Sequence, residues 1–358
     1  MRHSGGTGVM GDSAAASLVA LDWGTTSCRA YLLGAGGEVL ARRSGAGGVM
    51  GVTERAAEAG IDRADAFDQA FEALCGDWLR AAAGPVPVIA SGMVGSDQGW
   101  APAGYVELPV DLAHAALPLT TVVSSLGEVH ILPGLISTKT LPGVLRGEET
   151  QLVGAALEWD TSAGSAPDAE RLVVLPGTHA KWARLRGTVV TEFTTFMTGE
   201  IYSLLLNRSI LGRLVKPAGA PCWDSFDRGF DVSTGAAGDT GLLSTLFSAR
   251  SLVLTGRLEQ EQVGDYISGL MIGSEVRGAA HAWSGRPPDD VLLLGEDGLC
   301  ERYARALSRL GIRSARPAGD STPRALAHLA RRAGLLAPAG SDPTAPDRAT
   351  AVLQKWEA

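Results

Sequence analysis

The sequence predicts an α/β protein made of two related domains, and three observations support this prediction. Aliphatic strand patterns alternate with amphipathic helix patterns along most of the chain. The stretch GTTSCRAYL at residues 24–32 is echoed at the same spacing by GTHAKWARL at residues 177–185, and each follows a short aliphatic run. A chain of 358 residues that is 45% hydrophobic is long and apolar enough to bury two cores.

The first half of the chain has the patterns of a mixed α/β domain. Strand patterns occupy residues 18–21, 29–33, 86–90 and 129–136. A helix is predicted over residues 64–83, because apolar side chains recur on one face at Phe67, Phe71, Leu74 and Trp78. Pro142 and Gly143 interrupt this pattern. A helix is expected next over residues 146–159, followed by a linker or exposed loop at residues 161–170.

The second half continues with longer helices. Thr198 is expected to cap a helix over residues 201–214, with Glu200 near its positive end. Residues 263–283 predict a long helix, and three glycines in it would permit close packing: Gly269, Gly273 and Gly278. A strand, a turn and a helix are expected over residues 291–311. The segment 337–346 is poor in structure-forming residues, and a short terminal helix is expected after it.

Charge and cysteine content limit the kinds of partner and compartment. The formal net charge is −8 and Lys and Arg do not cluster, which argues against a nucleic-acid-binding surface. No apolar run reaches the roughly 18 residues that span a membrane, and residues 1–17 lack the features of a signal or transit peptide. A cytoplasmic protein with a disordered N-terminal extension is expected. Reduced, mostly buried thiols are expected for the scattered cysteines Cys28, Cys75, Cys222 and Cys300.

The first candidate site is the turn between the first two strands, at Asp22, Gly24, Thr25 and Thr26. Glycine lets backbone N–H groups come close to a phosphate, and threonine hydroxyls add hydrogen-bond donors. Asp22 cannot bind phosphate directly, but it can hold a hydrated Mg²⁺ that bridges phosphate oxygens. The turn therefore indicates a nucleotide tail plus a metal, and a plain β-hairpin with a polar turn is the alternative.

The second candidate is the repeated turn at Gly177, Thr178 and His179. Pro176 stands near the place where the first copy has its acid, so this turn could donate to phosphate but has no carboxylate for a metal. For His179, a satisfied turn histidine is the alternative.

The third candidate is the turn at Gly295, Glu296, Asp297 and Gly298, between a strand and a helix. A glycine-containing turn at the carboxyl end of a strand can admit a nucleotide base and ribose. The GxxG spacing is a weak signal by itself, and an ordinary strand-to-helix loop is the alternative.

The fourth candidate is the acidic pair Glu148 and Glu149. On a helical wheel Glu149 falls on the apolar stripe, whereas Glu148 falls at its border. A carboxylate on an apolar face is costly to bury unless it is paired or functional. We expect its pKa to be raised, which suits a general base for a substrate hydroxyl. The alternative is an N-terminal acid pair that stabilises the helix dipole.

The fifth candidate is the loop SGMVGSDQGW at residues 91–100. Ser96, Asp97 and Gln98 could take the hydroxyls of a polyol or sugar, and the indole of Trp100 could cover its face. A tight surface loop is the weaker alternative, because three residues of this loop are large and apolar.

In their order along the chain, these motifs resemble the plan of the actin, hexokinase and sugar-kinase superfamily. Within it, the chain closely resembles the 2-dehydro-3-deoxygalactonokinases from Leu18 to about Leu336. The resemblance rests on six phrases: DWGTTSCRAYLL, ASGMVGSDQGW, LPGVLRGEETQLVGA, LPGTHAKW, FTTFMTGEIYSLL and YISGLMIGSEV. It implies two ribonuclease H-like (actin-like ATPase) domains that flank a nucleotide cleft. It also implies transfer of the ATP γ-phosphoryl group to the 6-hydroxyl of 2-dehydro-3-deoxy-D-galactonate, in galactonate catabolism.

The resemblance also implies roles for individual residues. It assigns the first turn and the second turn to ATP phosphates, and the third turn to adenosine. Related sugar kinases have an aspartate as the base where this chain has its two glutamates. Glu149 is preferred for its helix face, and Glu148 and Asp97 remain open. At least one cation or a set of amide donors should meet the substrate carboxylate. The candidate cations are Arg29, Arg146 and Arg228, and an ordinary exposed arginine is the alternative for each.

The expected domains are residues 18–145, with the first phosphate hairpin and the substrate side, and residues 146–336, with the second hairpin and the adenosine motif. Residues 337–358 are expected to form a tail with a short helix.

The expected ligands are ATP, Mg²⁺ and a 2-keto-3-deoxy sugar acid; a homodimer is left open. A kinase of another sugar or sugar acid, and a non-catalytic nucleotide-dependent sensor of the same fold, remain alternatives.

Overall fold

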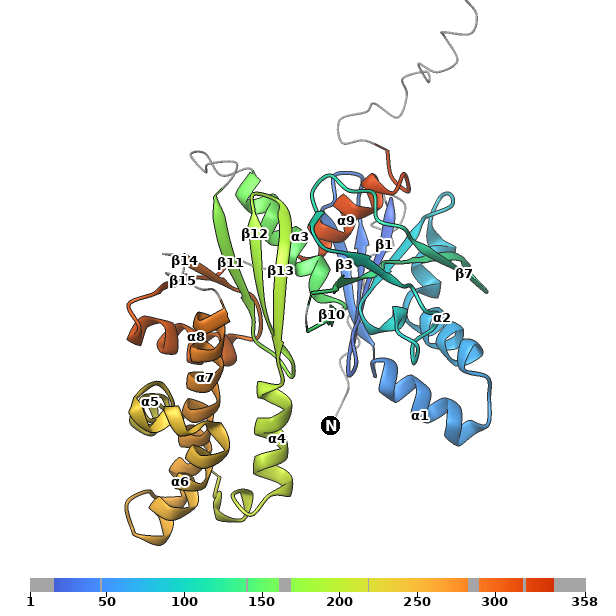
Figure 1. The fold of residues 1–358 in the computed structure, drawn as a ribbon. Helices are drawn as coiled ribbons and strands as arrows, with labels where there is room; N and C mark the ends of the chain where they lie inside the picture. The colour runs from blue at the N-terminus through green and yellow to red at the C-terminus, as the bar shows by residue number, and fades with distance from the viewer. Residues whose placement is uncertain are drawn as a thin grey trace, which may run out of the picture. The chain divides into compact units, whose positions relative to one another are not determined.

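The chain divides into two compact units. The computed structural model describes residues 16–45, 47–139, 141–160, 169–217, 219–282, 290–317 and 320–337. Unit 1 comprises the residues up to Val106, the segment His114–Gly134 and the residues from Thr322, and unit 2 comprises Glu107–Ala113 and Leu135–Ser321. Each unit is a β-sheet with helices packed against it (Figure 1). The predicted extension, linker and tail lie almost entirely outside the described residues.

Unit 1 has a mixed sheet with the strand order β3-β2-β1-β4-β8-β7. Its strands are β1 (Leu18–Trp23), β2 (Cys28–Leu33), β3 (Val39–Gly45), β4 (Val88–Ser91), β7 (Thr120–Ser124) and β8 (Gly127–Ile131). The central strand β1 pairs antiparallel with β2 and parallel with β4, and burial on both faces explains its aliphatic run. Because side chains alternate along a strand, Trp23 and Asp22 point to opposite faces of the sheet.

Three helices pack on the sheet of unit 1, namely α1 (Val49–Ala59), α2 (Arg63–Ala81) and α9 (Thr322–Arg332). The side chain of the N-cap residue Asp62 accepts a hydrogen bond from the Ala64 N–H at 2.7 Å and so starts α2. The predicted apolar stripe of α2 lies in the core of unit 1, as expected. The helix α9 contacts β1, β2 and β4, although its position in the sequence placed it in the second expected domain. It can reach back because one of its faces is apolar and buried, with Leu326 and Leu329.

Unit 2 repeats this arrangement in a second mixed sheet, with the order β15-β14-β11-β12-β13-β6. Its strands are β6 (Val110–Asp111), β11 (Glu170–Leu175), β12 (Ala180–Arg186), β13 (Val189–Phe196), β14 (Asp290–Leu293) and β15 (Arg313–Ala315). Like β1, β11 is antiparallel to its hairpin partner and parallel to the strand on its other side. The order β13-β12-β11-β14-β15 matches β3-β2-β1-β4-β8, so the predicted duplication is confirmed.

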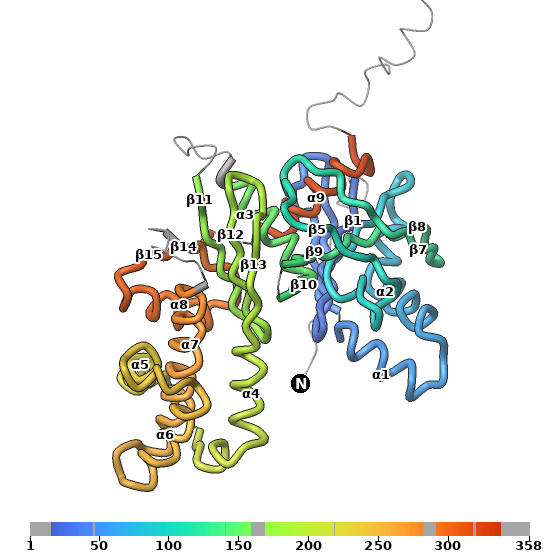
Figure 2. The backbone as a smooth tube through the Cα atoms, in the orientation of Figure 1, coloured from blue at the N-terminus to red at the C-terminus, as the bar shows by residue number. Residues whose placement is uncertain are grey.

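The helices of unit 2 are α3 (Glu148–Asp160), α4 (Thr198–Arg208), α5 (Trp223–Thr234), α6 (Leu242–Leu254), α7 (Val263–Ala282) and α8 (Asp297–Arg309). Figure 2 shows α4, α5 and α6 gathered around α7, and each of them contacts it. The prediction of close packing by glycines in α7 is confirmed, because Gly269 and Gly273 lie against the backbone of Phe226 and Phe230 in α5. None of the helices in the described part of the chain is long and apolar enough to cross a membrane.

One predicted strand is two strands. The pattern over residues 129–136 is divided between β8 and β9 (Gly134–Ser137), which belong to different sheets. Pro133 stands between them and has no N–H to donate, which helps to end the first pairing. The strand β9 pairs with β10 (Gly143–Leu145), in a small sheet that also contains β5 (Tyr105–Glu107).

Candidate active site

The first predicted phosphate turn is a four-residue loop at the tip of the β1-β2 hairpin. The Gly24 N–H donates to the Ser27 carbonyl at 2.9 Å, and the side chains of Thr25 and Thr26 are exposed. Asp22 lies opposite Arg29 in the hairpin register, with 3.5 Å between Arg29 Nη1 and Asp22 Oδ2. The turn therefore presents hydroxyls and backbone groups beside a partly exposed carboxylate.

The N-terminus of α1 packs directly on this turn. The Val49 N–H donates to the Gly24 carbonyl at 3.0 Å, and the Met50 N–H donates to the Thr25 carbonyl at 3.1 Å. This approach requires glycine at position 48, because a Cβ there would lie only 2.5 Å from the carbonyl carbon of Thr25. The helix thus fixes the position of the turn.

The loop that follows β4 begins beside the same hairpin. A Cβ on Gly92 would lie 2.7 Å from the Trp23 carbonyl oxygen, so this backbone approach also requires glycine. The Asp97 carbonyl accepts a hydrogen bond from Arg63 Nη1 at 2.7 Å, which ties the loop to the start of α2. Two predicted substrate residues, Asp97 and Gln98, have exposed side chains, and Ser96 is partly buried with its hydroxyl donating to the Met93 carbonyl.

Trp100 has a different role from the one predicted. Its side chain is only 6% exposed, and its ring stacks on Phe67 with centroids 6.1 Å apart and also contacts Trp23 and Phe71. The substrate contact predicted for Trp100 is therefore corrected. The indole anchors the loop in the aromatic core of unit 1, and this explains why the loop contains so large an apolar residue.

Trp100→Ala is expected to lower the free energy of unfolding by about 3 to 5 kcal/mol, because it leaves a large cavity among aromatic rings. Chemical denaturation of the purified variant measures this loss. Trp100→Phe, which keeps an aromatic ring, should lose less. Unchanged stability in Trp100→Ala, together with a raised KM for the acceptor substrate, would instead support the predicted contact between Trp100 and the substrate.

The second predicted phosphate turn, in unit 2, is also held by the start of a helix. It joins β11 and β12, and the Glu200 N–H near the start of α4 donates to the Thr178 carbonyl at 2.9 Å. A Cβ on Gly199 would lie 2.8 Å from Thr178 Cα, so glycine is required here as it is at the start of α1. His179 Nε2 lies 2.5 Å from Glu200 Oε2, so this histidine has a partner within the protein.

The predicted helix cap at Thr198 is wrong. Met197 is the N-cap residue and Thr198 is the first residue of α4, which ends at Arg208; a short 3-10 turn follows at Gly212–Leu214. The side chain of Thr198 instead forms a hydrogen bond with the buried carboxylate of Glu275, and it is therefore directed into unit 2.

Glu149 lies fully buried in the first turn of α3. Its Oε2 accepts a hydrogen bond from the Gly147 N–H at 2.5 Å, and its Oε1 has no hydrogen-bond partner among the described residues. Burial, and then the charge of Glu148, raise the pKa of Glu149 to about 8. The predicted burial and raised pKa are confirmed.

Glu148 differs from its neighbour because both of its oxygens have partners. Its Oε1 lies 3.1 Å from Lys181 Nζ, and its Oε2 accepts a hydrogen bond from the Arg146 N–H at 3.0 Å. Lys181 is 4% exposed, follows the second turn, and donates to the His179 carbonyl at 2.8 Å. Sequence reasoning missed this lysine. The alignment of the two hairpins could have pointed to it, because Lys181 occupies the strand position at which the first hairpin has the buried Cys28.

The third predicted turn lies beside the second one. A Cβ on Gly295 would lie 3.1 Å from the Pro176 carbonyl oxygen, so the two turns nearly touch. The carboxylate of Glu296 is the N-cap of α8 and accepts hydrogen bonds from the Gly298 and Leu299 N–H groups at 3.1 and 2.9 Å. A Cβ on Gly298 would meet only this carboxylate within 4 Å, so the space above Gly298 is open.

A small cavity of about 90 Å³ lies between the second turn and the helices α4, α7 and α8. Its walls include Gly177, Thr198, Gly199, Leu299 and Tyr303. The second predicted turn and the first turn of α8, which follows the third predicted turn, therefore line one cavity.

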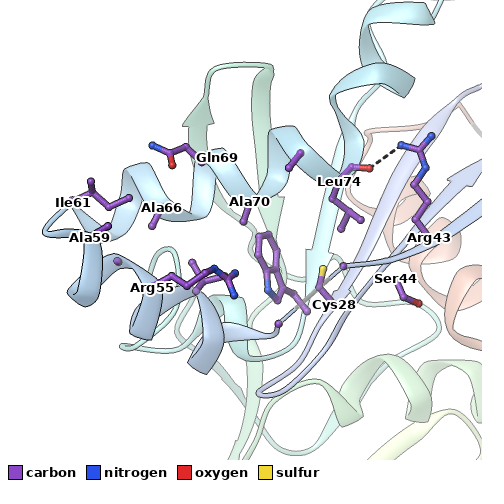
Figure 3. A pocket seen from close by; sticks show the side chains of 16 residues that line it. Cys28, Arg43, Ser44, Arg55, Ala59, Ile61, Ala66, Gln69, Ala70 and Leu74 are labelled. Atoms are coloured by element: carbon purple, nitrogen blue, oxygen red, sulfur yellow. Dashed lines mark hydrogen bonds between the residues drawn. The ribbon is translucent and has the colours of Figure 1, made fainter. Parts of the chain in front are cut away.

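A larger pocket of about 820 Å³ lies in unit 1, between α1, α2 and the strands β2 and β3 (Figure 3). None of the predicted site residues lines it. Its wall is mainly apolar, and Arg43 donates to the Leu74 carbonyl. The thiol of Cys28 also lines it, and burial raises the pKa of that thiol. The cysteines of the described part of the chain are free thiols, as expected.

The candidate cations differ in their surroundings. Arg29 is partly exposed beside Asp22 in unit 1. Arg228 donates to the Arg257 carbonyl at 2.7 Å and lies over the ring of Tyr266, so it packs among the helices of unit 2. Arg146 belongs to unit 2 and precedes the two glutamates.

Comparison with known proteins identifies the family. The family model described as 2-keto-3-deoxy-galactonokinase matches residues 22–329. A probable 2-dehydro-3-deoxygalactonokinase of Rhizobium meliloti is 37% identical over 322 residues, which are 88% of this chain and 96% of that protein. The 2-dehydro-3-deoxygalactonokinase of Escherichia coli is 32% identical over 313 residues, covering 86% of this chain and 94% of that protein.

A solved structure supports the same relation. The crystal structure of a protein from Sinorhizobium meliloti with the same assigned activity aligns with 88% of this chain and 98% of its own, at 35% identity and a TM-score of 0.72. The matched range includes both predicted phosphate turns, the acidic pair and the third predicted turn. The chain belongs to the 2-keto-3-deoxy-galactonokinase family.

Proposed function

We propose that this chain transfers the γ-phosphoryl group of ATP to the 6-hydroxyl of 2-dehydro-3-deoxy-D-galactonate, giving the 6-phosphate. Family membership supports the reaction as a whole. The observation that supports the ATP half most directly is the duplicated turn, in which exposed hydroxyls and backbone groups are fixed by the start of a helix in each unit. Phosphoryl transfer depends mainly on positioning and charge neutralisation, and rigid turns suit both.

The residues proposed for ATP are those of the three turns. Gly24, Thr25 and Thr26 would hold phosphate oxygens in unit 1, and Gly177 and Thr178 would do so in unit 2. His179, paired with Glu200, would support the second turn. Adenosine would bind near Gly295 and Gly298, and Glu296 would act there as the cap of α8.

The first turn fits a magnesium ion. Asp22 offers a partly exposed carboxylate next to the turn, and no cluster of three or more acidic, histidine or cysteine ligands occurs in the described part of the chain. Mg²⁺ in kinases is held by one or two carboxylates, by waters and by the phosphates themselves, so a single acid is enough. The ion would neutralise phosphate charge, and Asp22 would orient it.

Glu149 is proposed as the base that accepts the proton of the attacking hydroxyl. Its Oε1 is a buried acceptor without a donor among the described residues, and such an orphan atom is unusual unless a ligand completes it. Glu148 is tied to Lys181 and to the backbone, so it would fix the start of α3 and the second turn. Asp97 would instead bind substrate hydroxyls, together with Ser96 and Gln98, and Arg29 would meet the substrate carboxylate. A cytoplasmic location and a homodimer stay predictions.

Asp22→Asn is expected to raise the Mg²⁺ concentration needed for half-maximal activity by about tenfold or more, because an amide is a poorer ligand for this hard cation. A Mg²⁺ titration at saturating ATP measures the change. Asp68→Asn, which alters an acid bound to Ser125 away from the turn, should leave the titration unchanged. An unchanged titration for Asp22→Asn would remove this residue from the metal site.

The reaction itself is tested by following ADP formation with ATP, Mg²⁺ and a panel of 2-keto-3-deoxy sugar acids and simple hexoses. Turnover with 2-dehydro-3-deoxy-D-galactonate and production of its 6-phosphate are expected. Turnover confined to another acceptor would reassign the substrate, and ATP binding without turnover on any acceptor would favour a sensor.

A further inference from the structure

We propose that Glu275 is a positioning residue of the nucleotide site, whose carboxylate holds the second phosphate turn and the adenosine turn in register with each other. This role rests on the proposed function, because it assumes that ATP binds between these turns. Glu275 itself does not line the cavity of about 90 Å³ between the second turn and the helices α4, α7 and α8. It would act through residues that do.

The carboxylate of Glu275 joins three other elements of unit 2. Trp182 Nε1 of β12 donates to Glu275 Oε1 at 2.6 Å, and the Tyr303 hydroxyl of α8 donates to Oε2 at 2.7 Å. The side chain of Thr198, at the start of α4, adds a third hydrogen bond. One side chain on α7 therefore connects β12, α4 and α8.

These interactions are shielded from water. Glu275 is 3% exposed, Trp182 is 2% exposed and Tyr303 is 1% exposed. Burial raises the pKa of Glu275, while hydrogen bonds from Thr198, Trp182 and Tyr303 lower it. A buried carboxylate is costly unless donors surround it, and here all three donors are uncharged. Its presence in an apolar core is explained if it determines how these elements are placed.

Two of the three donors belong to helices that begin next to the predicted ATP motifs. Thr198 and Tyr303 both line the small cavity. Thr198 is followed by Gly199, which packs against the second turn at Gly177 and Thr178. Tyr303 lies on the helix that begins at the third turn, where Gly295 approaches Pro176. Loss of the carboxylate would leave these walls without their common partner.

The experiment measures binding of a non-hydrolysable ATP analogue by titration calorimetry, together with KM for ATP, KM for the sugar acid and kcat. Glu275→Met keeps the volume but removes both acceptors, and we expect the dissociation constant of the analogue to rise at least about tenfold. Glu275→Gln keeps one acceptor, and a rise of about threefold is expected. The KM for ATP should follow the same order, while kcat at saturating ATP and the KM for the sugar acid change less.

The control is Val276→Ala, which removes buried volume from the same core at the neighbouring position of α7. It should lower the melting temperature but leave binding of the analogue unchanged. Equal loss of affinity in this control, or wild-type affinity in Glu275→Met, would overturn the proposal. If Glu275→Met does not fold, Glu275→Gln decides the matter, because wild-type affinity in that variant contradicts the expected graded loss. Binding of the analogue does not require turnover, so failure of the kinase reaction would be seen separately.

Discussion

Glu149→Gln is expected to lower kcat by about 10²- to 10⁴-fold, the usual contribution of a positioned general base. The amide keeps nearly the same shape and can still accept a hydrogen bond from the Gly147 N–H, so the start of α3 should be preserved. What it loses is the ability to take a proton from the attacking hydroxyl at the orphan oxygen. Steady-state kinetics with the sugar acid measure the loss, and ATP affinity should change little.

The pH dependence provides a second signature of Glu149. Because its pKa is raised to about 8 and the base acts in its ionised form, kcat/KM for the sugar acid should rise with pH up to about pH 8. This rise should be absent in Glu149→Gln. A wild-type profile that is flat between pH 6 and 9, or an unaltered rise in the variant, would contradict the assignment.

The same raised pKa has a consequence for stability. A carboxyl whose pKa is higher in the folded state than in the unfolded state favours folding at low pH, and this contribution is lost as pH rises from about 4.5 to about 8. Since one pKa unit corresponds to about 1.4 kcal/mol, the buried charge costs up to about 5 kcal/mol above pH 8. Glu149→Gln should therefore be more stable than the wild type at pH 9, by an amount that decreases toward pH 5.

Variants at the other two carboxylates separate their roles. Glu148→Gln loses the ion pair with Lys181, and it should lower kcat less than Glu149→Gln does, because both Glu148 oxygens are already occupied within the protein. Asp97→Asn should raise the KM for the sugar acid more than it lowers kcat. If instead Glu148→Gln or Asp97→Asn abolishes turnover while Glu149→Gln is active, the base is one of those residues.

Local patterns in the sequence were enough to predict the parts of the fold that are fixed by local physics. The aliphatic run of β1, the apolar stripe of α2 and the repeated hairpins follow directly from side-chain periodicity. Glu149 was found in the same way, because a helical wheel shows which acid shares the apolar face, and burial then determines the direction of its pKa.

The remaining features depend on contacts between segments that are distant in the sequence. The sequence predicts that Trp100 covers the face of a sugar, because it does not reveal that Phe67 and Phe71 of α2 pack against this indole. The helix α9 follows the second sheet in the chain but packs on the first sheet, against the N-terminal strand β1. Lys181 and Glu275 become significant only when their partners on other elements are known.

Gly199→Ala and Gly48→Ala are expected to impair ATP use in the same way, because the two residues have equivalent places in the duplicated fold. In each case the new Cβ would overlap the backbone of one of the proposed phosphate turns, at Thr178 or at Thr25, so the helix or the turn must move. A displacement of this size can cost about 10²-fold in kcat/KM for ATP, with about 1 to 3 kcal/mol of stability lost through overpacking. Kinetics at varied ATP and chemical denaturation measure the two effects.

Two other glycines separate the effect on ATP from the loss of stability. Gly60 ends α1 and Gly311 follows α8, both with positive φ and with open space where a Cβ would stand. Gly60→Ala and Gly311→Ala should therefore cost about 1 kcal/mol through backbone strain and leave kcat/KM for ATP near the wild-type value. If all four variants reduce ATP use in proportion to lost stability, the turns are structural hairpins. If only Gly48→Ala and Gly199→Ala reduce ATP use, the nucleotide binds where each turn is fixed by the start of a helix. The duplication seen in the sequence then has a functional role.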